Sequence, residues 1–123
     1  MAERLLVSVV DDDESVRESL PDLLREFGFA TKAFASAAEF LASDVIGQTK
    51  CLLLDIAMPG MTGIELQQEL TRRQQEIPIV FITGLGDEHF RARVLAQGAV
   101  ECLHKPFSER ALLDAVRAAL GVT

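Results

Sequence analysis

The hydrophobic positions of this chain form short apolar runs, and between them apolar residues recur every three or four positions. Uninterrupted apolar runs predict strands that are buried on both faces, whereas the three-to-four spacing predicts amphipathic helices. Strand and helix therefore alternate along the sequence. The expected strands are Leu5–Val10, Ala30–Phe34, Cys51–Leu54, Ile79–Ile82 and Val100–Leu103.

Polar residues and glycines mark the ends of the helices between these strands. An N-cap side chain accepts a hydrogen bond from a free backbone N–H of the first turn, and a C′ glycine adopts the left-handed conformation that ends a helix. Ser36 also precedes Glu39 by three residues, which is the spacing of a capping box. The candidate N-caps are Asp13, Ser36, Thr62 and Ser108, and the candidate C′ residues are Gly28 and Gly121.

Alternating strand and helix units with right-handed crossovers predict an α/β fold with a parallel sheet. We expect a flavodoxin-like (βα)5 three-layer sandwich with five parallel strands in the order 2-1-3-4-5. No repeat, low-complexity segment or change of composition divides the sequence, so residues 1–123 are expected to form one domain. A chain of this length buries roughly two-thirds of its unfolded surface, so its core is adequate without a disulfide or a structural metal.

Composition narrows the cellular setting and the partners. A net charge of −7 opposes non-specific attraction to nucleic acid or to an anionic membrane. The run Leu5–Val10 is too short for a signal peptide or a membrane span. Cys51 and Cys102 lack the spacing of a zinc site, and we interpret them as small buried hydrophobic residues in a reducing compartment. We therefore expect a cytoplasmic domain.

Each of four predicted strands is followed by polar residues of a specific kind. The carboxyl ends of parallel strands meet at one edge of a sheet, so these residues are expected to gather in one crevice. They are Asp11 and Asp12 after the first strand, Asp55 after the third, Thr83 after the fourth and Lys105 after the fifth.

The three aspartates suggest a phosphoryl-transfer site that uses a cation. Asp55 ends a buried strand with its carboxylate exposed at the edge of the sheet, as a nucleophile toward phosphorus would. Asp11 and Asp12 concentrate negative charge, which would raise carboxylate pKa values and repel a phosphoryl donor unless Mg²⁺ were present. The alternatives are a strand-end aspartate that caps a loop and a solvated acidic N-cap cluster.

Thr83 and Lys105 add groups that suit a phosphoryl oxygen. The Thr83 hydroxyl can donate a hydrogen bond, and Gly84 lets the backbone approach closely. Lys105 can pair with Asp55 at rest and with the phosphoryl group after transfer. Taken singly, the two residues would be an ordinary strand-end threonine and an exposed lysine.

The sequence resembles the receiver domain of two-component response regulators along essentially its whole length. The segments that carry the resemblance are VVDDDESVRESL, CLLLDIAMPGMTG, VFITGLGD and LHKPF, which occur in the family's order and spacing. The amino-acid sequences of the last two segments are most similar to those of FixJ-type transcriptional regulators.

The resemblance implies specific roles for the site residues. Asp55 would take a phosphoryl group from a sensor histidine kinase or a phosphotransfer protein. Asp12 and Asp55 would bind Mg²⁺ directly, Ala57 would contribute its main-chain oxygen, and Asp11 would act through a bound water. The peptide bond between Lys105 and Pro106 would be cis, although the sequence alone favours trans.

The implied function is a phosphorylation-activated switch in a phosphorelay, which controls transcription through an effector domain absent from this chain. Such a domain catalyses only its own phosphorylation and dephosphorylation, contacts no nucleic acid itself, and dimerises reversibly around its fourth helix, fifth strand and fifth helix. A Mg²⁺-dependent phosphohydrolase of the haloacid dehalogenase type is an alternative, but it would need an aspartate where Ala57 stands. A stand-alone receiver that acts through protein–protein contacts is another.

One position departs from the family pattern. Cys102 lies three residues before Lys105, where the family usually has a tyrosine or phenylalanine that changes rotamer on phosphorylation. A cysteine is too short for that movement, so we expect the loop Gly84–His89 to report the state instead. Its glycines, Gly84 and Gly86, permit the backbone change, and Phe90 and Val94 would form the surface that transmits it.

Overall fold

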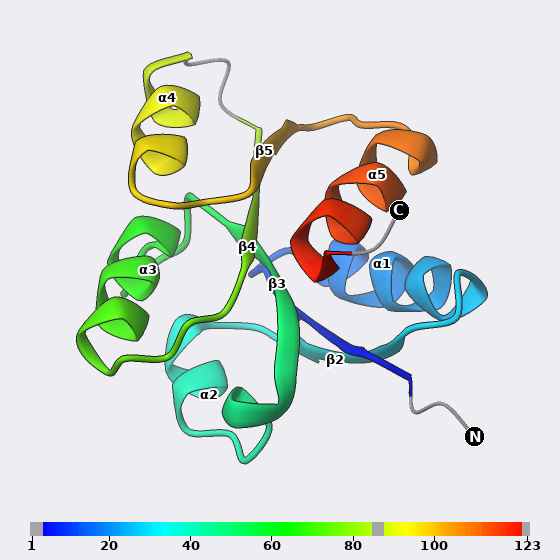
Figure 1. Cartoon of the computed structure of the whole chain (residues 1–123), viewed down its shortest axis with the longest axis horizontal. Coiled ribbons are helices and arrows are strands. Elements are labelled where there is room, and N and C mark those ends of the chain that lie inside the picture. Colours follow the sequence, from blue (N-terminus) through cyan, green and yellow to red (C-terminus); the bar gives the residue numbers. More distant parts are fainter. Residues whose placement is uncertain (1–3, 85–87, 122–123) are drawn as a thin grey trace.

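The computed structural model describes residues 4–84 and 88–121, and it contains a five-stranded parallel sheet (Figure 1). The strand order is β2-β1-β3-β4-β5, so the flavodoxin-like order predicted from the sequence is confirmed. The strands are β1 (Leu6–Val10), β2 (Ala30–Phe34), β3 (Thr49–Asp55), β4 (Ile79–Thr83) and β5 (Glu101–His104).

Helices cover both faces of the sheet and complete three layers. Helices α1 and α5 lie on one face, and α2, α3 and α4 lie on the other (Figure 1). Each face has its own apolar core, because the buried side chains of the central strands alternate between the two sides. The helices are α1 (Glu14–Glu26), α2 (Ala37–Leu41), α3 (Gly63–Arg72), α4 (Glu88–Ala96) and α5 (Glu109–Leu120), with a 3-10 turn at Ile46–Gln48.

The predicted helix caps are present. Asp13, Ser36 and Ser108 each accept a backbone N–H of the first turn that follows. The reciprocal capping box, however, is complete at Thr62 and Glu65, whereas at Ser36 only the backbone half forms. The glycines at the ends of the first and last helices have positive φ angles. Gly28, at +96°, follows the C-cap Phe27 as predicted, whereas Gly121, at +72°, is itself the C-cap and not the C′ residue.

The expectation that every strand is buried on both faces is wrong for β2. Lys32 and Ala33 are exposed, because β2 lies at the edge of the sheet and pairs only with β1.

Strand β3 begins earlier than predicted. The polar residue Thr49 is buried there, and its hydroxyl lies 2.7 Å from that of Ser8. A buried hydroxyl pair lets polar residues occupy strand positions at little cost.

Both cysteines are free thiols and are buried, as predicted. Burial raises the pKa of Cys51 to about 12, so this thiol stays protonated and unreactive. Within the described residues, no helix combines the length and the apolar character that crossing a membrane requires.

Candidate functional site

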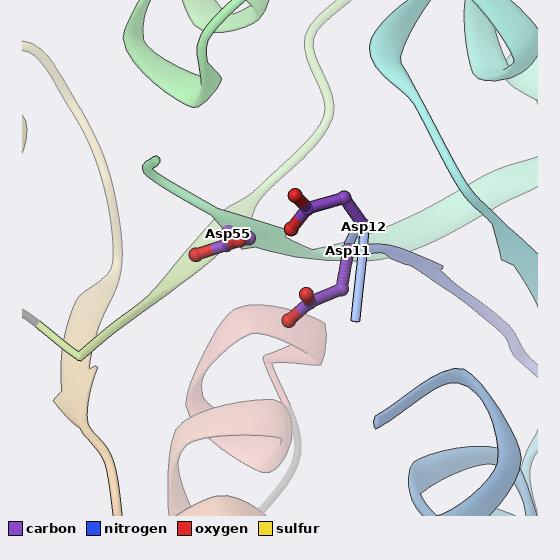
Figure 2. Close-up of side chains that lie close together, drawn as sticks. All are labelled: Asp11, Asp12 and Asp55. Atoms are coloured by element: carbon purple, nitrogen blue, oxygen red, sulfur yellow. The ribbon is translucent and has the colours of Figure 1, made fainter. Parts of the chain in front are cut away.

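Three carboxylates meet at the carboxyl end of the sheet, between β1 and β3. Asp11 and Asp12 directly follow β1, and Asp55 is the last residue of β3. One carboxylate oxygen from each residue lies within 4.8 Å of the others. Figure 2 shows the Asp11 and Asp12 side chains extending from the end of β1 on the side where Asp55 lies. These adjacent strands lead to helices on opposite faces of the sheet, so the cluster lies at the topological switch point.

The three aspartates differ in burial. Asp11 is 1% exposed and Asp55 is 6% exposed, whereas Asp12 is open to solvent. The expectation of an exposed Asp55 carboxylate is therefore wrong. The loop after β3 folds back over the end of the strand, because the Gly63 amide donates to the carbonyl of Ile56 at 3.0 Å.

Asp11 is held through all of its polar groups. Its backbone N–H donates to Phe34 of β2 at 3.1 Å, and its carbonyl accepts from Nη1 of Arg17 at 3.0 Å. Its carboxylate accepts from the Asp13 N–H at 2.9 Å and from Nζ of Lys105 at 3.3 Å. Asp11 therefore joins the ends of β1, β2 and β5 to the start of α1.

The ion pair between Lys105 and Asp11 corrects one expectation. Lys105 was expected to pair with Asp55, but within the described residues its salt bridge is with Asp11. The lysine is 29% exposed at its side chain, so it retains access to solvent at the rim of the site. Its positive charge still acts on Asp55, whose pKa it lowers.

The net effect of the surroundings on Asp55 is nevertheless a higher pKa. Burial raises the pKa of Asp55 most, followed by the negative charge of Asp11; the hydrogen bond and charge of Asp12 also raise it. Lys105 offsets only part of this, and the pKa of Asp55 reaches about 7. The cluster therefore carries more negative charge than its one lysine balances, which favours binding of a cation.

The donor set of the cluster fits a hard divalent cation. Asp11, Asp12 and Asp55 offer only oxygen atoms, which Mg²⁺ prefers over nitrogen or sulfur ligands. The two oxygens of Asp11 already accept protein hydrogen bonds, so Asp12 and Asp55 have the more available oxygens.

The remaining predicted site residues lie at or just after the carboxyl ends of β3 and β4. Thr83 is the last residue of β4 and is 4% exposed. Its carbonyl accepts the backbone N–H of Lys105 at 2.8 Å, which joins the ends of β4 and β5. Ala57 lies exposed in the loop after β3. The peptide bond between Lys105 and Pro106 is cis, as the family resemblance implies.

The expected route of transmission is only partly described. Gly86 and the middle of the loop Gly84–His89 lie outside the described residues. Val94 of α4 is fully buried in the core, so the expectation that it forms a transmitting surface is wrong, and Phe90 is only partly buried against that core. Cys102 is 8% exposed on β5 and belongs to the same core.

Sequence reasoning missed two residues that shape the site. A Cβ atom on Gly63 would lie 2.3 Å from the main-chain oxygen of Asp55, so only glycine fits at the start of α3. The signal was available, since a glycine directly after the N-cap Thr62 has no role in capping. Arg17 was also missed, because an arginine in the second turn of an amphipathic helix normally faces solvent.

A doubly wound α/β sheet with a carboxylate cluster at its switch point defines a class of proteins that bind ligands at the carboxyl ends of their strands. Residues 7–117 match the response regulator receiver domain family, so the chain belongs to that family. The resemblance found in the sequence is thereby confirmed.

Relatives and solved structures agree with this assignment. Nodulation protein W of Bradyrhizobium diazoefficiens is 47% identical over 116 residues, which cover 94% of the chain and 51% of the relative. The transcriptional regulatory protein FixJ of Azorhizobium caulinodans is 42% identical over 121 residues, covering 98% and 57%. The chain thus spans about half the length of these curated relatives.

Two solved structures share the fold closely. The response regulator StyR superimposes with a TM-score of 0.89 at 50% identity, over 97% of this chain and 60% of that one. The structure of FixJ-N superimposes with a TM-score of 0.86 at 36% identity, over 98% of this chain and 96% of that one. The chain is therefore a receiver domain of two-component response regulators.

Proposed function

We propose that the chain is a phosphorylation-activated switch in which Asp55 accepts a phosphoryl group with the help of Mg²⁺. The donor is a sensor histidine kinase or a phosphotransfer protein. The observation that carries this proposal is the group of three carboxylates within 4.8 Å of one another, with Lys105 bound to one of them. A lone strand-end aspartate that caps a loop would need neither the other carboxylates nor the lysine.

In this proposal, Mg²⁺ is held by the carboxylates of Asp12 and Asp55 and by the main-chain oxygen of Ala57. Asp11 contributes through a water molecule, because both of its carboxylate oxygens already accept hydrogen bonds from the protein. When bound, the ion supplies the positive charge that lets carboxylates and a phosphoryl group come together.

The residues of the chain then carry out the transfer. An oxygen of the Asp55 carboxylate attacks phosphorus, the bond between phosphorus and the histidine nitrogen breaks, and the electron pair of that bond returns to the imidazole. The Thr83 hydroxyl donates a hydrogen bond to a phosphoryl oxygen. Lys105 moves from Asp11 to the phosphoryl group, because the new negative charge lies within reach of its flexible side chain.

The names of the relatives support the output proposed for this switch. FixJ is named a transcriptional regulatory protein, and the chain covers 57% of it. We propose that residues 1–123 form one receiver domain, that an effector domain controls transcription, and that phosphorylation promotes a reversible homodimer around α4, β5 and α5. A phosphohydrolase of the haloacid dehalogenase type is disfavoured, because Ala57 stands where that class needs an aspartate.

The phosphoacceptor is tested by incubating the protein with Mg²⁺ and a small phosphodonor, followed by intact-protein mass spectrometry. We expect one acid-labile phosphoryl group on the wild type and none on Asp55→Asn. Asp44→Asn is the matched control, since Asp44 is an exposed aspartate outside the cluster and should remain competent. Full labelling of Asp55→Asn, with the adduct mapped to another residue, would refute the role of Asp55.

The metal site is tested by comparing Asp12→Ala with Asp13→Ala. Both variants lose one exposed carboxylate, but Asp13 uses its side chain to cap α1. Asp12→Ala should weaken Mg²⁺ binding by about 10-fold or more, whereas Asp13→Ala should mainly lower stability by about 1 kcal/mol. The chain has no tryptophan or tyrosine, so binding is best followed by NMR titration. Equal weakening in the two variants would indicate general charge attraction instead of a site.

A further inference from the structure

Arg17 lies close to the acidic cluster although it carries the same sign of charge as a metal ion. It is partly buried in the first half of α1, and its Nη1 donates to the main-chain oxygen of Asp11 at 3.0 Å. Its own backbone N–H donates to the carbonyl of Asp13 at 3.1 Å. Arg17 therefore spans the turn between β1 and α1 from both its backbone and its side chain.

The carbonyl that Arg17 holds belongs to the peptide unit joining Asp11 to Asp12. A peptide unit is planar, so fixing its oxygen also fixes the direction in which the Asp12 backbone leaves it. The Asp11 side of this unit is secured by Phe34, Asp13 and Lys105. The Asp12 side chain, in contrast, is exposed. Its carboxylate shares a hydrogen bond with Asp55, but no lysine, arginine or backbone N–H of the described residues donates to it.

We propose that Arg17 is a positioning residue for the metal site: it fixes the peptide between Asp11 and Asp12, and thereby holds the Asp12 carboxylate toward Asp55. This inference rests on the proposed function, because it concerns the Mg²⁺ ligands assigned there. Arginine suits this positioning role better than lysine. Its guanidinium group is planar and rigid, so the side chain loses less conformational entropy for each hydrogen bond that it makes.

Two effects of Arg17 on a metal ion have opposite signs, which makes the proposal decidable. As a positive charge, Arg17 repels a cation, so removing it should strengthen Mg²⁺ binding. As a positioning residue, Arg17 orders a ligand, so removing it should weaken Mg²⁺ binding. The direction of the change therefore distinguishes the two roles.

The experiment measures Mg²⁺ affinity by NMR titration for the wild type, Arg17→Met, Arg17→Lys and Arg25→Met. Arg25→Met is the matched control, because it removes one positive charge from the same helix at a residue that instead contacts Asp22 and Thr31. We expect Arg17→Met to bind Mg²⁺ about 10-fold more weakly, at the low end for a residue that orients a ligand. Arg25→Met should bind no more weakly than the wild type.

Arg17→Lys keeps the charge, so weaker binding in this variant would come only from lost positioning and would support the proposal even if Arg17→Met failed to fold.

The metal-free proteins give a second readout. The backbone amide signal of Asp12 should shift in both Arg17 variants and stay in place in Arg25→Met. Unchanged or stronger Mg²⁺ binding in the folded Arg17 variants, with an unmoved Asp12 signal, would overturn the proposal. If the wild type bound no Mg²⁺, the proposed metal site would fail, while the Asp12 signal would still test Arg17.

Discussion

The two ends of the parallel sheet contrast in what they bury. At the carboxyl end, Asp11 is 1% exposed and each of its polar groups has a partner. At the amino end of β4, Gln67 of α3 is 5% exposed, but its Oε1 has no hydrogen-bond partner among the described residues. Its Nε2 makes only a long bond of 3.5 Å to the carbonyl of Gln97. The hydrogen-bonding groups of the charged residue, Asp11, are therefore better satisfied than those of the neutral residue, Gln67.

The amino end of the sheet also carries a cleft. A cleft of about 770 Å³ opens at the amino end, between α3 and the segments that precede β4 and β5. Of the residues that the structure describes, those that line it carry amide, hydroxyl and apolar side chains, and Glu76 is the one with a charge. The carboxylates, the lysine and the threonine lie at the other end. The comparison teaches that the direction of the strands, and not the position of this cleft, decides where the reactive side chains gather.

The largest expected effect is on the carboxyl end, from Gly63→Ala. A Cβ atom there would lie 2.3 Å from the main-chain oxygen of Asp55, so strand or helix must shift. We expect a loss of about 3 kcal/mol in the free energy of unfolding, measured by denaturant titration with circular dichroism. Gly47→Ala is the matched control, because nothing lies within 4 Å of a Cβ at that position. Equal stability of the two variants would show that the approach of α3 to Asp55 is not tight.

The next effect concerns pH and Asp55. The pKa of Asp55 in the folded, metal-free protein is about 7, above its ordinary value of 3.8, so the fold binds a proton that the unfolded chain releases. This contribution to stability is fully present below about pH 4 and is lost as the pH rises through 7. Asp55→Asn carries no such proton, so its stability should exceed that of the wild type at pH 8 by on the order of 2 kcal/mol.

This pH effect is measured by urea titrations of metal-free protein between pH 4 and pH 8. That range includes the pKa of Asp55, which is about 7. The advantage of Asp55→Asn should appear only as the pH rises. Asp44→Asn, which changes an exposed aspartate, should follow the wild-type profile. Parallel profiles for the wild type and Asp55→Asn would mean that Asp55 is ionised in the fold at an ordinary pKa.

The smallest effect is expected at the amino end, from Gln67→Met. This substitution removes a long hydrogen bond and also an unpartnered buried oxygen, and these two effects oppose each other. The free energy of unfolding should change by less than about 1 kcal/mol, and Mg²⁺ affinity should not change. A loss well beyond that in guanidinium titrations would show that Oε1 has a strong partner, such as a buried water.

The sequence predicted the fold well because its signals are local. Buried strands and helix caps such as Thr62 and Ser108 depend on nearby residues, and the strand order then follows from right-handed connections. The burial of β2 was misjudged although the predicted order 2-1-3-4-5 already placed this strand at the edge of the sheet, where one side of the strand has no neighbour. Gln67 was missed because a polar residue inside an apolar helix stripe gives no sign of its own burial.

The residues of the candidate site could be predicted from the sequence, but the hydrogen bonds and ion pairs among them could not. The direction of the strands brings Asp11, Asp12 and Asp55 together, and this follows from the topology alone. Which carboxylate Lys105 contacts depends on differences of a few ångströms between neighbouring loops, and no sequence pattern carries that information. The contact between Arg17 and Asp11 likewise depends on local geometry that no sequence pattern carries.

Helix α4 buries fewer side chains against the rest of the domain than its neighbour α3. Where burial is described, Val94 is its only fully buried side chain, whereas α3 buries five residues. Its ion pair to β5, between Arg91 and Glu101, is partly exposed and adds little. In terms of hydrogen exchange, α4 should open as a local unit well below the global unfolding free energy, and its amides should exchange before those of α3 or α5. A helix that unfolds separately can be reorganised without disturbing the sheet that carries the carboxylates.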